Sequence, residues 1–171
     1  LYDKKISKTF NVDLKYRPSS YLLNSKVNIK TKKINIDDII LKEFWINKRI
    51  NENQSKKLNN FFWLFSIDLK SSNSLIQSII KNWLELNFKY NHNNWNFNIT
   101  SKRIISWLSN SKLTYDESNE QYRKDFDFNI QKQAVHLINQ IDNIHNLNNK
   151  LVGIAAIILV GLCYKDEKIF F

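Results

Sequence analysis

The sequence predicts an all-α protein built from antiparallel helical hairpins. Two glycines and one proline in 171 residues leave few turn formers for a many-stranded β fold. Hydrophobic residues make up 43% of the chain, which is enough for one domain with a real core. Apolar residues also recur at helical spacing through the second half of the sequence.

Residues 1–58 are predicted to form an irregular or extended N-terminal segment and a connector. The first 35 or so residues alternate between polar and apolar only in places, and they contain Pro18. The stretch "DDIILKEFWIN" suits a short helix or a strand equally well. Residues 47–57, "NKRINENQSKK", are polar and typical of a solvated connector. The helical portion is therefore expected over residues 59–171.

The helical portion begins with a short aromatic helix, "NNFFWLFSIDL", from residue 59. The next helix carries one broad apolar stripe: Leu75, Ile76, Ile79, Ile80, Trp83 and Leu84. Ser74 and Gln77 have the spacing of a capping box at its start. In the following helix, "ITSKRIISWLSN", the spacing turns Ile104, Ile105 and Leu108 inward together.

The clearest helix follows Ser118, which forms a second capping-box pattern with Gln121. One apolar stripe continues for more than five turns: Tyr122, Phe126, Ile130, Ala134, Leu137 and Ile141. Sustained spacing of this kind predicts a long amphipathic helix packed on the core.

The last helix is predicted in "NLNNKLVGIAAIILVGLCY", residues 146–164. Its uncharged run is too short for a typical membrane span of about 20 residues, and Lys150 and Lys165 close it. We therefore expect a core helix and no membrane span. It is apolar nearly all round, which favours burial between other helices, with Gly153 and Gly161 allowing close approach. Cys163 has no cysteine partner and is expected in the core.

The net charge of +10 suggests an anionic partner, either nucleic acid or an acidic polysaccharide. Codon composition is a competing explanation, because Lys, Asn and Ile all have A/T-rich codons and the lysines are scattered. No phosphate loop, HExxH, GxSxG or zinc spacing occurs, and His92, His136 and His145 are not spaced as a metal set. We therefore expect no metal and no cofactor.

Two groups of residues are candidates for ligand binding. Trp95, Arg103 and Trp107 are expected to share a surface, since aromatic rings beside a guanidinium suit sugars that bear carboxylates. The alternative is that both tryptophans are core residues and Arg103 tethers a loop.

The second group, Asn148, Asn149 and Lys150, lies at the start of the last helix. Free backbone N–H groups and the positive end of the helix dipole suit an anion at that position. The alternative here is an ordinary asparagine N-cap.

Several segments, in this order and spacing, resemble the heparinase II/III-like polysaccharide lyases, in particular their alphaproteobacterial branch. They are "FFWLFSIDL", "IIKNWLELN", Trp95, "ITSKRIISWLSN", "YRKDFDFNIQKQAVHLINQ" and "NNKLVGIAAIILVGLCY". The resemblance covers roughly residues 60–171. It implies part of an incomplete (α/α) toroid, with further helices and a β-sandwich domain beyond residue 171. It also suggests a periplasmic or cell-envelope setting.

The resemblance implies β-elimination on an acidic polysaccharide that contains uronic acid. That reaction requires neutralisation of the carboxylate, so that the adjacent proton becomes acidic. Related lyases supply the neutralising pair from an Asn-Asn-His triplet, which here reads Asn148-Asn149-Lys150. Asn149 is thus the implied carboxylate binder, whereas Lys150 suits an anion but is a poor base at neutral pH. The catalytic tyrosine is expected after residue 171, so this portion alone is expected to be inactive.

Two other functions remain open at this point. One is a non-catalytic carbohydrate-binding or scaffold protein of the same fold, in which Lys150 marks lost catalysis. The other is a basic helical nucleic-acid binder, which would need its lysines on one face. We expect an acidic polysaccharide as the partner, in preference to nucleic acid.

Overall fold

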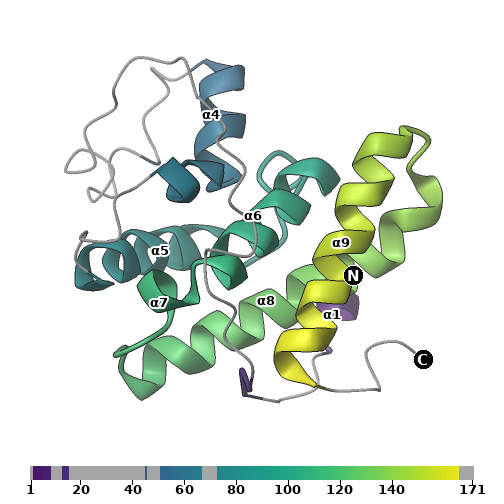
Figure 1. Ribbon diagram of the computed structural model, residues 1–171. Helices are drawn as coiled ribbons and strands as arrows, with labels where there is room; N and C mark the ends of the chain where they lie inside the picture. The colour runs from purple at the N-terminus through teal and green to yellow at the C-terminus, as the bar shows by residue number, and fades with distance from the viewer. Residues whose placement is uncertain (1, 9–12, 16–44, 46–50, 67–72, 166–171) are drawn as a thin grey trace.

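The computed structural model describes residues 2–8, 13–15, 45, 51–66 and 73–165, and Figure 1 shows their arrangement. These residues are mostly helical and contain no strand, which confirms the all-α class. The predictions for residues 16–44 and 46–50 lie outside the described residues. The longer helices are α4 (Glu52–Asn59), α5 (Asn73–Asn87), α6 (Phe97–Ser109), α8 (Glu120–Gln140) and α9 (Leu147–Tyr164). The shorter ones are α1 (Tyr2–Ile6), η2 (Phe62–Ser66), α7 (Ser111–Thr114) and η3 (Ile141–Asn143).

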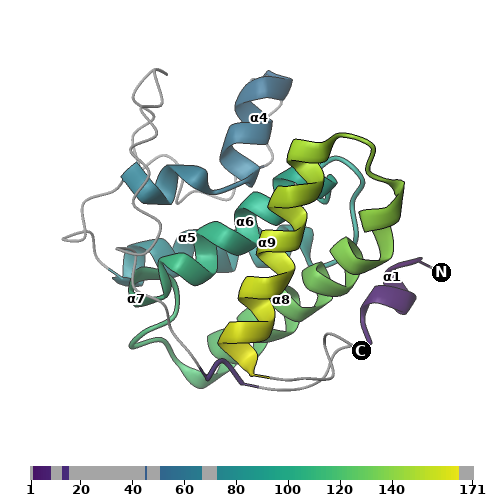
Figure 2. The ribbon, with the colours of Figure 1, turned by 45° about the vertical axis from the view of Figure 1, so that its right-hand side comes forward.

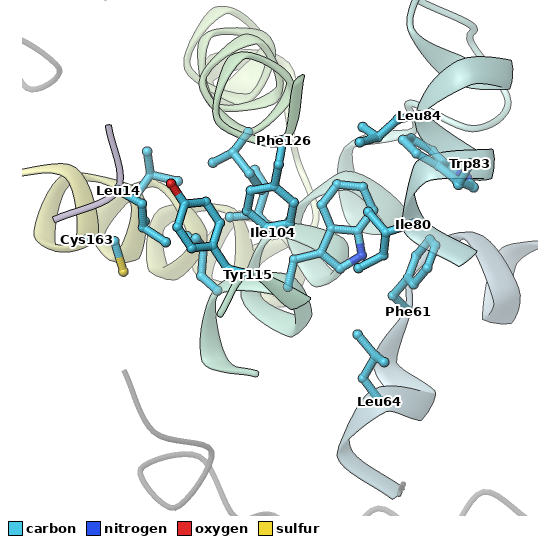
Figure 3. Packing of buried hydrophobic residues seen from close by; sticks show 14 of the residues in the cluster. Leu14, Phe61, Leu64, Ile80, Trp83, Leu84, Ile104, Tyr115, Phe126 and Cys163 are labelled. Atoms are coloured by element: carbon cyan, nitrogen blue, oxygen red, sulfur yellow. The ribbon is translucent and has the colours of Figure 1, made fainter. Parts of the chain in front are cut away.

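Aromatic contacts join α5, α6, α8 and the residue before η2 at the centre of the core, two of them edge-to-face and one tilted. The ring of Phe61, which precedes η2, lies 5.1 Å from that of Trp107 on α6 and 6.0 Å from that of Trp83 on α5. Trp107 also contacts Phe126 on α8, at a centroid distance of 5.4 Å. Phe61, Trp83 and Phe126 are labelled in Figure 3. Such rings bury large areas and prefer these geometries, so they fix how the helices meet.

The apolar stripes predicted for α5 and α8 are confirmed. Leu75 is half-buried and the other five stripe positions of α5 are buried. On α8 the stripe is buried from Tyr122 to Leu137, and Ile141 packs against its end. The periodicity of apolar residues was sufficient to predict the buried positions of α5 and α8, because one face of each helix meets the core.

The N-terminal part is more helical than predicted. Residues 52–57, expected as connector, lie in α4, and residues 2–6 form α1. Asn51 starts α4 with a capping box in which its side chain accepts from Gln54 N–H and Gln54 accepts from Asn51 N–H. An N-cap of this kind compensates for a polar sequence with little apolar periodicity.

Both capping boxes predicted further along the chain are wrong. Gln77 Nε2 donates to the carbonyl of Asp116 at 2.7 Å, so its side chain ties α5 to the loop after α7. At α8 the N-cap is Asn119, whose side chain accepts from Tyr122 N–H at 2.9 Å. Ser118 instead donates to the carbonyl of Tyr115.

Helix α9 is buried on one face only, against α6 and α8 (Figure 2). The buried face carries Gly153, Ala156, Val160, Gly161, Cys163 and Tyr164. On the opposite face five large aliphatic residues are 38–68% exposed: Leu147, Leu151, Ile154, Ile158 and Leu162. The expectation of burial all round is therefore wrong for the described chain, although the core position of Cys163 is confirmed. By length and composition alone α9 would also pass for a membrane span, a test that core helices pass too.

Gly153 allows α9 to approach α6. A Cβ atom at Gly153 would overlap the ring of Phe97, the first residue of α6. We expect Gly153→Ala to lower the free energy of unfolding by about 1–3 kcal/mol, because the ring must move within a packed interface. Urea denaturation of the two proteins measures this loss.

A second substitution separates this clash from a general intolerance of the site. Adding Phe97→Leu should recover part of the loss, so that the double variant is more stable than the sum of the two single effects. Strict additivity would contradict the assigned contact.

Candidate anion-binding site

A pocket of about 440 Å³ lies between α4 and α6. We call it the α4–α6 pocket, and its lining residues are Asn53, Lys56, Lys57, Asn60, Asn96, Asn98, Ile99 and Lys102. The lining contains three lysines, four asparagines and one apolar side chain, with no carboxylate. Such a composition suits an anion that also bears hydroxyl groups.

The lysines of the α4–α6 pocket differ in their partners. Lys56 Nζ lies 2.6 Å from a carboxylate oxygen of Glu52, one turn earlier on α4. Lys57 and Lys102 form no ion pair with any carboxylate of the described residues. Within the described part of the chain, no carboxylate is paired with these two positive charges at the pocket. An incoming anion can pair with them without breaking an internal ion pair.

The asparagines of the pocket place hydrogen-bond donors beside these cations. The side-chain oxygen of Asn60 accepts from Phe62 N–H at 2.8 Å, and that of Asn96 accepts from Asn98 N–H at 3.1 Å. Because the oxygens are engaged, the amide NH₂ groups remain to donate. Asn96 is also the N-cap of α6, so the positive end of that helix dipole lies at the pocket.

Asn149 borders the α4–α6 pocket through Asn98. The side-chain NH₂ of Asn98 donates to the side-chain oxygen of Asn149, which joins the first turns of α6 and α9. Asn146 is the N-cap of α9 and accepts from Asn149 N–H at 3.0 Å. Asn149 and Lys150 are both half-buried. The structure thus places Asn149 next to a basic pocket that the sequence did not reveal.

The expected surface of Trp95, Arg103 and Trp107 does not exist in the described chain. Trp95 is 1% exposed, and Arg103 and Trp107 are fully buried. The alternative weighed for them, core tryptophans with a tethering arginine, agrees with the structure. Spacing of one helix turn puts Arg103 and Trp107 on the same side of α6, but it does not reveal which face of a helix meets the core.

Arg103 ties three segments to α6. Its Nε donates to Gln133 Oε1 on α8 at 2.8 Å, and its Nη1 donates to the carbonyls of Asn59 and Asn94, each at 2.9 Å. The guanidinium also lies 4.1 Å from the ring centroid of Trp83. Burial lowers the pKa of Arg103 well below its usual value. Carbonyl and amide oxygens and an aromatic face therefore surround this cation.

The sequence held one usable signal for the α4–α6 pocket. Asn51 and Gln54 have the spacing of a capping box, which predicts a helix start and would place Lys56 and Lys57 in its last turn. Lys102 is one residue from Arg103, and nothing in the sequence shows that it meets α4. No group of three or more His, Cys, Asp or Glu side chains in the described residues is placed to hold a metal ion.

Comparison with known proteins gives no match: no family model, no curated protein and no solved structure is significantly similar to this chain.

Two buried titratable groups on α8, Asp127 and His136, have pKa values shifted in opposite directions. Burial raises the pKa of Asp127 to about 6, although its carboxylate accepts from the hydroxyls of Tyr164 at 2.8 Å and Tyr115 at 2.9 Å. Burial lowers the pKa of His136 to about 4. Its Nε2 lies 2.8 Å from the carbonyl of Trp95, so Nε2 carries the proton and Nδ1 accepts.

We expect Arg103→Lys to lower the free energy of unfolding by about 3 kcal/mol. Lysine keeps the charge but cannot reach the oxygens of Gln133, Asn59 and Asn94 at once, and buried acceptors left without donors are costly. Chemical denaturation measures the loss, with Lys102→Arg on the half-buried neighbour as control. Equal stability of wild type and Arg103→Lys would show that the fork of hydrogen bonds contributes nothing.

The pH dependence of stability should change when Asp127 is neutralised. A raised folded pKa gives Asp127 a stabilising contribution at low pH that is lost as pH rises through about 6. The lowered folded pKa of His136 gives the opposite slope, with stability lost as pH falls through about 4. The two slopes oppose each other in the wild type between these values.

Asp127→Asn removes only the pH dependence of stability that comes from Asp127. Its stability relative to wild type should therefore rise with pH, by up to about 1.4 kcal/mol per pH unit between pH ~4 and ~6. Denaturation at a series of pH values tests this, with the exposed Asp125→Asn as control. A difference that does not vary with pH would contradict the raised pKa.

Proposed function

We propose that this chain binds an acidic polysaccharide at the α4–α6 pocket, as part of a heparinase II/III-like lyase. The observation that carries the proposal is the pair Lys57 and Lys102, two cations without carboxylate partners among the described residues. They face a volume of about 440 Å³, within the usual range for small-molecule pockets. Asparagine amides beside them suit the hydroxyl groups of a sugar.

The α4–α6 pocket would contribute charge neutralisation to the lyase reaction. β-Elimination removes the proton next to the uronic carboxylate, and the negative charge that develops spreads onto that carboxylate. Fixed cations and N–H donors stabilise such a charge because they need not reorganise. We assign this role to Lys57, Lys102 and the Asn98–Asn149 pair, and we assign no general base to them.

The same resemblance leads us to propose that the helices belong to an incomplete (α/α) toroid. Helices α8 and α9 are joined by the short η3 segment and lie side by side, as the hairpin of such a fold requires (Figure 2). Lys150 favours a second candidate, a non-catalytic binder of the same fold, because the related lyases carry a histidine at that position.

The test is the affinity of the purified chain for heparan sulfate and polygalacturonate, measured by titration calorimetry. Lys57→Ser/Lys102→Ser should weaken binding at least about tenfold, which is about 1.4 kcal/mol, through the loss of two charge-assisted contacts. The matched control is Lys81→Ser/Lys112→Ser, which removes the same charge at exposed positions outside the pocket. If both double variants weakened binding equally, the loss of affinity would come from net charge alone, and this result would contradict binding at the α4–α6 pocket.

Catalysis is tested separately, on the longest natural chain that contains this sequence. Ultraviolet absorbance of the unsaturated product follows the elimination. Activity that falls on Asn149→Ala, with binding retained, supports the lyase and the residue together. Tight binding without any product on all polymers tried would favour the non-catalytic binder.

A further inference from the structure

Helix α1 covers a cluster of polar and aromatic groups that the α4–α6 pocket does not include. The cluster lies mainly on α8 and on the segment before α6, and it comprises Tyr90, Trp95, Lys132, His136 and Gln140. Helices α1 and α4 are far apart in both views of the ribbon (Figures 1 and 2). A function of this cluster is therefore separate from that of the pocket.

The first half of the cluster holds a carboxylate. Asp3 Oδ1 lies 2.8 Å from Lys132 Nζ and accepts from the backbone N–H of Tyr90 at 2.7 Å. Lys132 is 1% exposed, and its ammonium lies 5.2 Å from the ring centroid of Phe88 and 5.5 Å from that of Trp95. A buried ammonium between aromatic rings requires an anion, which Asp3 supplies. The side chain of Asp3 is 40% exposed, so solvent reaches this contact.

The second half of the cluster holds a hydroxyl group. Since His136 Nδ1 accepts, the hydroxyl of Tyr2 donates to it, at 2.7 Å. The same hydroxyl accepts from Gln140 Nε2 at 3.2 Å. The ring of Tyr90 packs beside these groups, with its centroid 4.8 Å from that of Tyr2 and 6.1 Å from that of Trp95.

We propose that this cluster is a binding site for a sugar acid, and that α1 occupies it as an internal ligand. Neighbouring side chains of α1 present one carboxylate and one hydroxyl, the two groups that a uronic acid also presents. In the cluster, a cation and a backbone N–H bind the carboxylate, and a neutral imidazole and an amide bind the hydroxyl. Aromatic rings that suit the face of a sugar ring lie beside these groups. An isolated five-residue helix has almost no stability of its own, so its place depends on these contacts and on the burial of Ile6. A ligand that supplies the same groups competes with α1.

The experiment removes the internal carboxylate and offers a replacement. Asp3→Ala leaves Lys132 without its anion, so the Tm should fall by several degrees. Sodium D-glucuronate should raise the Tm of Asp3→Ala more than that of wild type, whereas D-glucose and sodium chloride of equal ionic strength should not. Asp142→Ala, which removes an exposed carboxylate elsewhere, is the matched control and should gain no more than wild type.

Two combined variants and a hydrogen-exchange measurement on the wild type test the location of the site. The gain should disappear in Asp3→Ala/Lys132→Met and persist in Asp3→Ala/Lys57→Ser/Lys102→Ser, which separates this site from the α4–α6 pocket. In wild type, saturating glucuronate should speed hydrogen exchange of residues 2–8, because α1 is displaced; this arm does not require the variants to fold. Acetate acting as well as glucuronate would overturn the sugar part of the proposal. No glucuronate-specific gain in Asp3→Ala, together with unchanged exchange in wild type, would overturn the site.

Discussion

The buried guanidinium of Arg103 is the constraint on which the rest of the structure depends. It bonds the carbonyls of Asn59 and Asn94 and the side chain of Gln133, and among the described residues no carboxylate neutralises it. Asn59 ends α4, and Asn94 lies in the segment that leads into α6. Asn60, the next residue after Asn59, and Asn96, two residues after Asn94, line the α4–α6 pocket. Arg103 thus sets the distance between the pocket walls from below, without being accessible to a ligand. Its fixed cation adds to the positive potential of a pocket that is lined by three lysines.

A second buried charge organises the other end of the molecule. Asp127 accepts hydroxyl bonds from Tyr115 and Tyr164, so α8, the loop after α7 and the end of α9 meet at one carboxylate. The carbonyl of Cys163 also accepts from Lys15 N–H at 2.9 Å, which brings the N-terminal segment to the same place. Burial of this carboxylate costs desolvation energy, which its hydrogen bonds to the two tyrosine hydroxyls offset.

The sequence predicted the helices better than the site, and the reason is physical. Periodicity located α5 and α8 because each has one face in the core. It failed for α4, whose polar sequence depends on the cap at Asn51, and for α9, whose apolar residues surround the helix while only one face is packed. Trp95, Arg103 and Trp107 were expected on a surface and are buried, since spacing along a helix does not reveal which face meets solvent. Lys57 and Lys102 line the same pocket although they lie more than forty positions apart in the sequence, and no local pattern encodes such an arrangement.

The two candidate sites differ in how their cations are satisfied, and this difference determines how each would bind. Lys57 and Lys102 have no carboxylate partner among the described residues, so an anion that enters the α4–α6 pocket displaces no ion pair of that part of the chain, and its binding should weaken with salt. Lys132 is buried and already paired with Asp3, so a ligand there must first displace α1. Its apparent affinity is the intrinsic affinity multiplied by the fraction of molecules in which α1 is undocked. One chain can therefore carry an open site and a covered site for the same chemistry. Only the covered site would couple ligand binding to the position of the N-terminal helix.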